Sequence, residues 1–585
     1  MGAISFAGSA IFVQRGRLTL ILRDASNEVC TGFDLFLTEM SGANMIVFRD
    51  GADDVSGRDL AARYLRNIQS LKPQEQTSTL DALLLAGEVE CALNDSEHPY
   101  TQSAIAITDA MAALFVNPSC GAEKGLLSRA QQLADKFPLI VRVSQPEGFA
   151  YYALHPGDFA DAVAGFSFSG SAAIVGIRSI GTTLSAVAMA ALNAKGIAAS
   201  RTTVRPTGHP YDRETRFSPQ QQSWVAAENQ RGSAFLVVDE GPGLSGSSFL
   251  SAAEALLALG VSANRITLLG THDVTPSHLC ARDAARRWMR FSWNKVPSRI
   301  YRRFEHMTPL GGGNWRDLIL ASSAEWPPCW PEMEALKFWS DDRQSIYKFE
   351  GLGRAGNSAR ERSKWLYHAG YGVWIEDAGD GMTQYEFVSG TPLTPASLSA
   401  EILLRMAKYC AYRATEFRTS RQIDPQLSQM LSHNFFEETG QRLELADALC
   451  SPSPVIADGH MQPYEWIQGL DGRTIKVDAA QHGDDHFLPG PTDIAWDLAG
   501  AIVEWNMSAE AEQYFLSSFR AHGGKTEKEQ MDAFTLAYCA FRTGYCRMAL
   551  SASPDPEEHS RWRKAHLYYR AKMIESARTR FELAS

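Results

Sequence analysis

Two adjacent acidic residues, Asp239 and Glu240, follow a short apolar run that predicts a buried strand. A loop rich in glycine and serine comes next and leads into a helical pattern; its polar residues are Ser245, Gly246, Ser247 and Ser248. The N-terminus of a helix attracts phosphate through its free backbone N–H groups and its dipole. Carboxylates this close to a phosphate suit a neighbouring diol, or a metal ion that bridges to a second phosphate. The segment therefore predicts a site for a phosphorylated, hydroxyl-bearing ligand.

An earlier loop has the same character. Residues 176–183 follow another apolar run and enter a helical pattern, and the segment 205–216 between the two loops is rich in cations. In an open parallel sheet, the loops at the carboxyl ends of the strands form the ligand site. Glycine-rich turns also occur in doubly wound folds without such a role, so the order of the two loops matters more than either one alone.

The two loops together resemble the motif of type I phosphoribosyltransferases, which use 5-phosphoribosyl-1-diphosphate (PRPP). The resemblance implies that Asp239 and Glu240 hold the ribose hydroxyls and that residues 245–248 hold the 5′-phosphate. It implies that the segment between the loops closes as a lid, and that the earlier loop binds pyrophosphate through Arg178, Ser179, Gly181 and Thr182. This chain departs from the family in a spacer that is one residue longer and in serines that replace threonines. There is also a faint likeness to domains of tellurium-resistance gene clusters.

A second pair of acids stands nearer the C-terminus. Asp458 follows one short apolar strand pattern and Asp478 follows another, with a turn signal at residues 471–472 between them. Phosphoryl transfer requires one carboxylate that orients the acceptor hydroxyl and one that holds a metal ion. The polar segment 482–486 is either a further metal or substrate site or a solvated loop. The two acids predict a phosphotransfer site.

This region resembles the aminoglycoside-phosphotransferase and protein-kinase-like family. The resemblance implies that Asp458 is the catalytic acid, that Asp478 binds the metal ion and that Asp497 braces the catalytic loop. It also implies a phosphate-pairing lysine, a glutamate partner for that lysine and an adenine-binding hinge, for which the candidates are Lys348, Glu361 and the segment from Glu386 to Val388. The segment 311–316 is the candidate glycine-rich loop. Pro463 replaces the family's metal-binding asparagine, which leaves Gln462 as the nearest substitute.

The distribution of helix and strand patterns predicts an α/β chain with three parts. Apolar strands alternate with Ala-rich helices from about residue 172 to 270, which favours a doubly wound parallel sheet. Beyond residue 300, antiparallel strand patterns precede long helical ones. We therefore expect an N-terminal α+β extension over 1–145, a phosphoribosyltransferase-like domain over 146–300 and a two-lobed α+β kinase-like domain over 301–585. The extension is expected to contain strands and one amphipathic helix, at Leu18–Leu22, Phe33–Leu37, Met45–Phe48 and Thr79–Leu93.

Composition excludes several classes of protein. The 585 residues include 56 Lys and Arg against 67 Asp and Glu, so a net charge of −11 gives no global field for nucleic acid. A 45% hydrophobic content argues against disorder. No uncharged apolar run reaches the ~18–20 residues of a membrane span, and the N-terminus lacks the basic region of a signal peptide. Nine cysteines without CxxC spacing favour a reducing compartment. We expect a cytoplasmic protein, with homodimerisation left open.

The function predicted from these patterns is a bifunctional transferase. One half would transfer a 5-phosphoribosyl group from PRPP to a nucleobase- or nucleoside-like acceptor, or run the reverse, with Mg²⁺. The other half would use ATP and Mg²⁺ to phosphorylate a hydroxyl group on a nucleoside- or sugar-like metabolite. Two alternatives stay open: a PRPP- or nucleotide-sensing regulatory protein with a degenerate kinase-like half, and a kinase that acts on protein or RNA. Neither acceptor has a recognisable sequence code.

Overall fold

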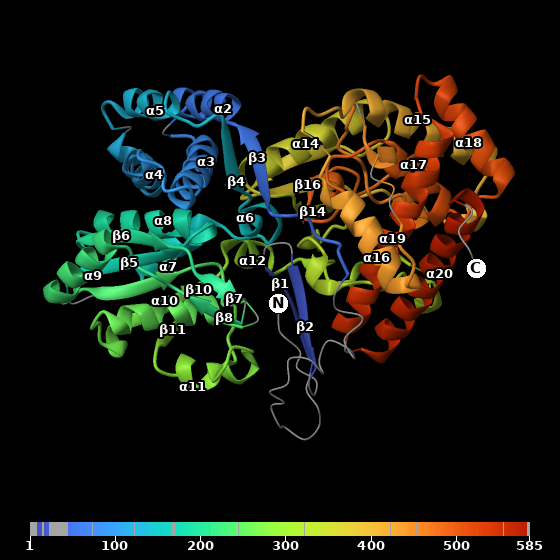
Figure 1. The fold of residues 1–585 in the computed structure, drawn as a ribbon. Helices are drawn as coiled ribbons and strands as arrows, with labels where there is room; N and C mark the ends of the chain where they lie inside the picture. The colour runs from blue at the N-terminus through green and yellow to red at the C-terminus, as the bar shows by residue number, and fades with distance from the viewer. Residues whose placement is uncertain are drawn as a thin grey trace.

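The computed structural model describes residues 9–14, 17–22 and 45–581, apart from residues 73, 122, 167–169, 210, 244, 321, 422, 444, 446, 452 and 554. The predicted strand at Phe33–Leu37 lies outside these residues. Figure 1 shows a group of N-terminal helices above a twisted sheet, and a larger, mainly helical mass beside both. None of the described helices is long and apolar enough to cross a membrane.

A five-stranded parallel sheet forms the centre of the first half. Its strands lie in the order β11-β10-β9-β5-β6, and every neighbouring pair is parallel. The bounds are β5 (Ala172–Ile177), β6 (Ala199–Val204), β9 (Ala234–Val238), β10 (Ile266–Gly270) and β11 (Ser292–Lys295). The central strands are apolar on both faces because helices cover both faces. The alternation of strands and helices predicted from the sequence is confirmed.

Successive residues of the strands enter two different cores. Ile174 and Leu236 pack on the side of α7 (Pro156–Ala164) and α8 (Ile180–Ala194). Val175 and Val237 pack on the opposite side, against α9 (Pro219–Arg231) and α10 (Ser247–Ala258). The segment predicted as a lid contains a small exposed hairpin, β7 (Thr207–His209) with β8 (Asp212–Glu214). The result is a three-layer α/β/α arrangement.

The N-terminal helices share a core with this sheet. They are α2 (Gly57–Gln69), α3 (Gln76–Asp95), α4 (Thr101–Val116) and α5 (Leu126–Ala134). The strands β3 (Ala52–Ser56) and β4 (Ile140–Ser144), which stand before and after these helices in the chain, pair antiparallel. The predicted helix at Thr79–Leu93 exists within α3, but it is buried on nearly all sides rather than amphipathic. The reason is that α2, α4, α8 and α14 all contact it.

Two lobes make up the second half. The first is an antiparallel sheet in the order β12-β13-β14-β16-β15, with α14 (Gly353–His368) packed against β15. Its strands are β12 (Thr308–Pro309), β13 (Lys337–Trp339), β14 (Ser345–Phe349), β15 (Ile375–Gly379) and β16 (Met382–Glu386). The second lobe combines a three-stranded sheet, β17-β18-β19, with six helices. This antiparallel-then-helical order agrees with the prediction.

The second lobe surrounds a separate core. Its strands are β17 (Gly390–Pro392), β18 (Trp466–Gly469) and β19 (Thr474–Lys476). Its helices are α15 (Ala400–Glu416), α16 (Gln426–Thr439), α17 (Ala495–Glu504), α18 (Ala509–Ala521), α19 (Lys528–Ala552) and α20 (Pro556–Phe581).

The segment from Met45 to Phe48 belongs to this second core and is not a strand as predicted. Phe48 makes an isolated bridge to Phe487, and the amide of Leu488 donates to the carbonyl of Val47 at 2.9 Å. Residues early in the chain therefore complete the core of the C-terminal half, which no local pattern reveals.

One buried ion cluster joins the N-terminal helices to the sheet. Arg201 of β6 donates two hydrogen bonds to Glu90 of α3, at 2.8 and 2.7 Å, and another to Asp109 of α4. The side chains of Arg201 and Glu90 are 2% and 0% exposed. Removing one member of a buried ion pair leaves an uncompensated charge in the interior.

We predict that Arg201→Ala lowers the free energy of unfolding by about 3–5 kcal/mol, because Glu90 loses its main partner inside the protein. Urea denaturation followed by circular dichroism measures the change. Arg216, which is 85% exposed beside Glu214, is the matched control, and its replacement by Ala should cost less than about 0.5 kcal/mol. Equal effects of the two substitutions would contradict a stabilising role for the buried cluster.

Candidate functional site

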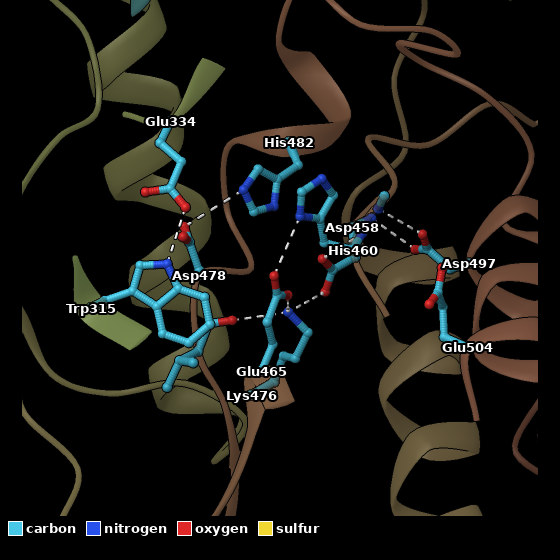
Figure 2. A network of polar contacts seen from close by, with 12 residues as sticks. Trp315, Glu334, Asp458, His460, Glu465, Lys476, Asp478, His482, Asp497 and Glu504 are labelled. Carbon is cyan, nitrogen blue, oxygen red and sulfur yellow. Dashed lines mark hydrogen bonds and ion pairs between the residues drawn. The ribbon is translucent and has the colours of Figure 1, made fainter. Parts of the chain in front are cut away.

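A carboxylate and two lysines connect the two lobes of the C-terminal half. Asp478 comes directly after β19, and Lys337 of β13 reaches its Oδ2 at 2.8 Å while Lys348 of β14 reaches its Oδ1. Burial opposes ionisation of Asp478, but Lys337 and Lys348 outweigh it and hold its pKa well below the usual range. Asp478 is therefore a fixed negative charge between the antiparallel sheet and the helical lobe (Figure 2).

Asp458 lies deeper in the same region. Its carboxylate accepts a hydrogen bond from the hydroxyl of Tyr409 and lies 3.4 Å from the ammonium of Lys476, and neither charged side chain is exposed (0%). Asp497 of α17 accepts the backbone N–H groups of Asp458 and Gly459 at 2.8 and 2.9 Å. Burial raises the pKa of Asp497 to about 6. These contacts are the brace expected of Asp497, and they hold the loop through its backbone.

A third carboxylate, Glu465, completes this group and was missed in the sequence. It accepts a hydrogen bond from Lys476 at 2.7 Å and lies 3.3 Å from the imidazole of His460. The ring of His460 stacks on His482 at 3.7 Å, and His482 lies 3.8 Å from Asp478 (Figure 2). The sequence signal that could have identified Glu465 is its place two residues after Pro463, which replaces the metal-binding asparagine of the family that this region resembles.

The geometry does not fit the predicted Mg²⁺ site. Each oxygen of Asp478 already contacts a lysine, and Glu465 contacts Lys476. Among the described residues, no group of three or more His, Cys, Asp or Glu side chains could hold a metal ion. Gln462, the other predicted ligand, is buried, and its Oε1 finds no hydrogen-bond partner in the described part of the chain. The ammonium groups of Lys337, Lys348 and Lys476 contact the carboxylates that a metal ion would have to bind.

Lys348 does not pair with Glu361 as predicted. Its second partner is Glu350, at 3.0 Å, whereas Glu361 is an exposed residue of α14 that lines a different cavity. The reason is helical phase, since the face of α14 that turns inward carries Arg360, Arg362 and Ser363 instead. Glu361 therefore takes no part in this ion network.

Glu386 and Val388, the predicted hinge residues, lie in the segment that joins the two lobes. Glu386 ends β16 and Val388 belongs to the connection to β17, which pairs with β18 of the other lobe. The predicted glycine-rich loop, residues 311–316, follows β12 and brings Trp315 into the polar network around Asp478 (Figure 2). Gly313 and Trp315 both donate hydrogen bonds to Glu334 at 3.0 Å, and Arg316 pairs with Glu558 of α20. Residues 340–344 form the connection between β13 and β14.

The other candidate residues gather at one edge of the parallel sheet. The strand order reverses direction between β5 and β9, and the loops after these two strands carry Arg178 to Thr182 and Asp239 to Glu240. Adjacent strands with oppositely directed connections leave a crevice at their carboxyl ends, where open α/β sheets bind ligands. The fold thus brings the two predicted loops side by side.

Most residues of the earlier loop have structural partners. Arg178 pairs with Asp95 of α3 at 3.2 Å, so its guanidinium is already committed to a carboxylate. A side chain at Gly181 would approach the carbonyl of Val238 to 2.6 Å, so glycine permits the close contact of α8 with β9. Thr182 is fully buried. Ser179 has φ +104°, which is strained for a residue other than glycine and is often seen at ligand-binding loops.

The later loop keeps its acids and serines close to the start of α10. The N–H of Ser247 donates to the hydroxyl of Ser245 at 3.1 Å, and Gly246 has φ +66° at the N-terminus of the helix. Burial, followed by the nearby charges of Asp239 and Glu147, raises the pKa of Glu240 to about 8. Glu240 is therefore mostly neutral at pH 7.

A short helix, α6 (Glu147–Tyr151), contacts both sites. On one side, a side chain at Gly148 would approach a carboxylate oxygen of Glu240 to 2.9 Å. On the other, the carbonyl of Phe149 accepts the N–H of Leu352 at 2.8 Å, and the hydroxyl of Tyr151 donates to the carbonyl of Asp484 at 3.1 Å. The helix joins the sheet edge to α14 and to the loop after Asp478.

Comparison with known proteins gives no assignment by sequence. No known protein family matches the chain, and no curated protein matches it. Choline kinase LicA from Streptococcus pneumoniae is similar in structure at 14% identity, over 46% of this chain and 98% of that one, with a TM-score of 0.30. A choline/ethanolamine kinase family protein from Mesorhizobium loti is similar at 13% identity, over 42% and 86%, with a TM-score of 0.30.

A spectinomycin phosphotransferase, APH(9)-Ia, solved with ADP and spectinomycin, is similar at 12% identity, over 48% of this chain and 98% of that one, with a TM-score of 0.30. By their names, these proteins are small-molecule phosphotransferases. At such TM-scores the likeness carries no argument about the activity of this chain, which depends on the residues themselves.

We predict that Glu240→Gln flattens the dependence of stability on pH. The folded-state pKa of about 8 exceeds the model-compound value of 4.5, so the folded form keeps a proton that the unfolded form releases between these values. The stability that the protonated Glu240 contributes is fully present below about pH 4.5 and is lost as the pH rises to about 8. The wild type should lose about 1–3 kcal/mol more than the variant between roughly pH 5 and 8.

Urea denaturation of both proteins across this pH range measures the difference. Glu214→Gln, at an exposed position of β8, is the control and should follow the wild type. Parallel curves for the wild type and Glu240→Gln would show that the carboxyl group is ionised throughout.

Proposed function

We propose that the C-terminal half binds ATP and transfers its terminal phosphoryl group to a hydroxyl group of a small molecule. The observation that carries this proposal is the contact between Lys348, on the antiparallel sheet, and Asp478, on the helical lobe. A lysine held beside an acid between two lobes offers a binding point for phosphate oxygens. The connection that contains Glu386 and Val388 would hold the adenine with backbone groups.

Asp458 would receive the proton of the acceptor hydroxyl. The acceptor oxygen then bonds to the γ-phosphorus as the bond to the β–γ bridging oxygen breaks, which releases ADP. Asp497 holds the loop in place through the two backbone N–H groups. Lys476 lies 3.4 Å from Asp458, so it must turn toward the incoming phosphate before the carboxylate can reach the substrate.

The contact between Lys476 and Asp458 favours a second candidate function. A catalytic carboxylate that is completely buried and paired with a buried lysine suits a domain that binds nucleotide without transferring phosphate. Asp478 already contacts lysines, and its surroundings do not fit Mg²⁺, which supports the same interpretation. In that case the chain would be a regulatory protein that senses a nucleotide.

Two substitutions distinguish these functions. Lys348→Ala should weaken ATP binding at least about tenfold, a loss of about 1.4 kcal/mol, because the phosphates lose a buried cation. Asp458→Asn should leave ATP binding within about twofold and lower phosphate transfer about 10²–10⁴-fold. Calorimetry with ATP, with and without MgCl₂, and a γ-phosphate transfer assay over nucleosides, sugars and aminoglycosides measure both quantities.

Lys528→Ala, at a position that is 84% exposed, is the control for Lys348. Wild-type transfer by Asp458→Asn would refute its catalytic role. Tight ATP binding without transfer to any acceptor would favour the sensing function, and an absence of ATP binding would exclude both.

We propose in addition that residues 146–300 bind PRPP, and that the helices of residues 1–145, which share a core with the parallel sheet, stabilise this region. The observation that carries this proposal is the reversal of strand order between β5 and β9, beside the acids and the serine loop. Asp239 and Glu240 would hold the ribose hydroxyls, and the start of α10 would hold the 5′-phosphate. In the reaction, a bond from C1′ to an acceptor nitrogen would form as the bond to pyrophosphate breaks, in either direction.

The double variant Asp239→Asn, Glu240→Gln should weaken PRPP binding at least about 100-fold, which corresponds to about 2.7 kcal/mol, because each amide replaces one of the two carboxyl oxygens with an NH₂ group that cannot accept a hydrogen bond from a ribose hydroxyl. Calorimetry with PRPP, with and without MgCl₂, measures this change. ATP binding should be unaffected, and Glu214→Gln should bind PRPP like the wild type. Unchanged PRPP affinity in the double variant would place the ribose site elsewhere.

A further inference from the structure

A cavity of about 260 Å³ lies where the N-terminal helices, α6 and α14 meet. It is separate from the residues proposed to bind ATP and PRPP, and its wall includes Arg63 of α2, Asp81 and Glu88 of α3, Phe149 of α6 and Arg354 of α14. It is slightly smaller than the ~300–1,000 Å³ typical of pockets for drug-sized ligands. Its wall combines charged and polar side chains with apolar ones, so an occupant would need polar groups facing the charged side chains.

Two guanidinium groups face this cavity. Arg63 and Arg354 both line the cavity, and burial and then the charge of Arg354 lower the pKa of Arg63. Glu88 forms an ion pair with Arg63 at 3.6 Å. The Nε–H of Arg63 is buried and finds no hydrogen-bond partner among the described residues. A pair of arginines with spare donors is the arrangement that carboxylate and phosphate groups bind best.

Hydrogen-bond acceptors stand opposite the arginines. Asp81 accepts a hydrogen bond from Asn357 at 2.8 Å through one oxygen, while its Oδ1 is buried without a partner in the described part of the chain. Burial raises the pKa of Asp81, as expected for a carboxylate with incomplete compensation. Glu88 Oε2 is buried and has no hydrogen bond there, although it forms the 3.6 Å ion pair with Arg63. Buried polar atoms of this kind normally have a partner, which points to a ligand that brings O–H or N–H groups.

The first turn of α14 adds to the positive potential. Arg354, Ala355, Asn357 and Ser358 line the cavity, and the start of this 16-residue helix has no side-chain cap. The helix dipole places partial positive charge there. The cavity therefore combines an anion-binding wall with an acceptor-lined wall.

We propose that this cavity is a third ligand site, for a small hydroxylated anion such as a sugar phosphate or a sugar acid. The anionic group would bind between Arg63 and Arg354, and the hydroxyl groups would donate to Asp81 and Glu88. The occupant would touch α6, which lies against Glu240, and α14, which follows the Lys348 strand. It would therefore bridge the three parts of the chain and stabilise them against one another.

Ribose 5-phosphate and gluconate are the two probes, and they distinguish a phosphate from a carboxylate. The full chain with Asp239→Asn and Glu240→Gln removes the proposed ribose site, so that remaining binding reports on the cavity. We expect saturable calorimetric binding of at least one probe, together with slower hydrogen exchange in peptides that cover 353–358. Adding Arg63→Ala and Arg354→Ala should weaken that binding at least tenfold.

Arg66→Ala is the matched control, because Arg66 is an exposed arginine of the same helix outside the cavity wall. Should the double alanine variant unfold, Arg63→Lys with Arg354→Lys keeps the charges but removes the guanidinium forks, and should also weaken binding. Absence of binding by both probes, or binding that ignores the arginine changes, overturns the proposal. Neither outcome depends on whether the intact chain binds PRPP or ATP.

Discussion

Buried charge in the C-terminal half constrains the rest of that half. Asp458, Asp478 and Glu465 are balanced by Lys337, Lys348 and Lys476, and most of these side chains are buried. A buried charge without its partner costs several kcal/mol, so strands β13, β14 and β19 must keep the register that joins these groups. The network therefore fixes how the antiparallel sheet sits on the helical lobe, and it leaves no unoccupied cluster of acids for Mg²⁺.

The same constraint acts between the two halves. One continuous apolar core includes α3, α4, α8, one face of the parallel sheet and residues Phe349 and Met382 of the antiparallel sheet. Helix α6 crosses this region with Gly148 against Glu240 and with hydrogen bonds to Leu352 and Asp484. A ligand that moves Glu240 would therefore press on an element that also contacts the start of α14 and the loop after Asp478. The divisions at residues 145 and 300 remain proposals about function, because packing runs across both.

Local sequence patterns predicted helices and strands well where the burial of an apolar run alone determined the element. The strands β5, β9 and β10 lie within the region from about residue 172 to 270 where the alternation was predicted, and β14 lies beyond residue 300 among the predicted antiparallel strands. The bracing contact of Asp497 was also expected. The predictions of a strand at Met45–Phe48 and of a Lys348–Glu361 pair were wrong, because the first depended on a distant segment and the second on the side of α14 that turns inward. Glu465 was missed because its role depends on contacts with Lys476 and His460, and the sequence pattern does not show that these side chains meet.

The sequence by itself determined the alternation of strands and helices, the two acid-bearing regions and the absence of a basic surface field, since these depend on residue types and short spacings. Only the tertiary structure decided which charges meet: Lys348 with Asp478, Arg178 with Asp95, and Arg63 beside Arg354. Ionic and hydrogen-bond partners are chosen by distances of a few ångströms between segments far apart in sequence. That proximity is set by how the cores pack, and no local pattern encodes it.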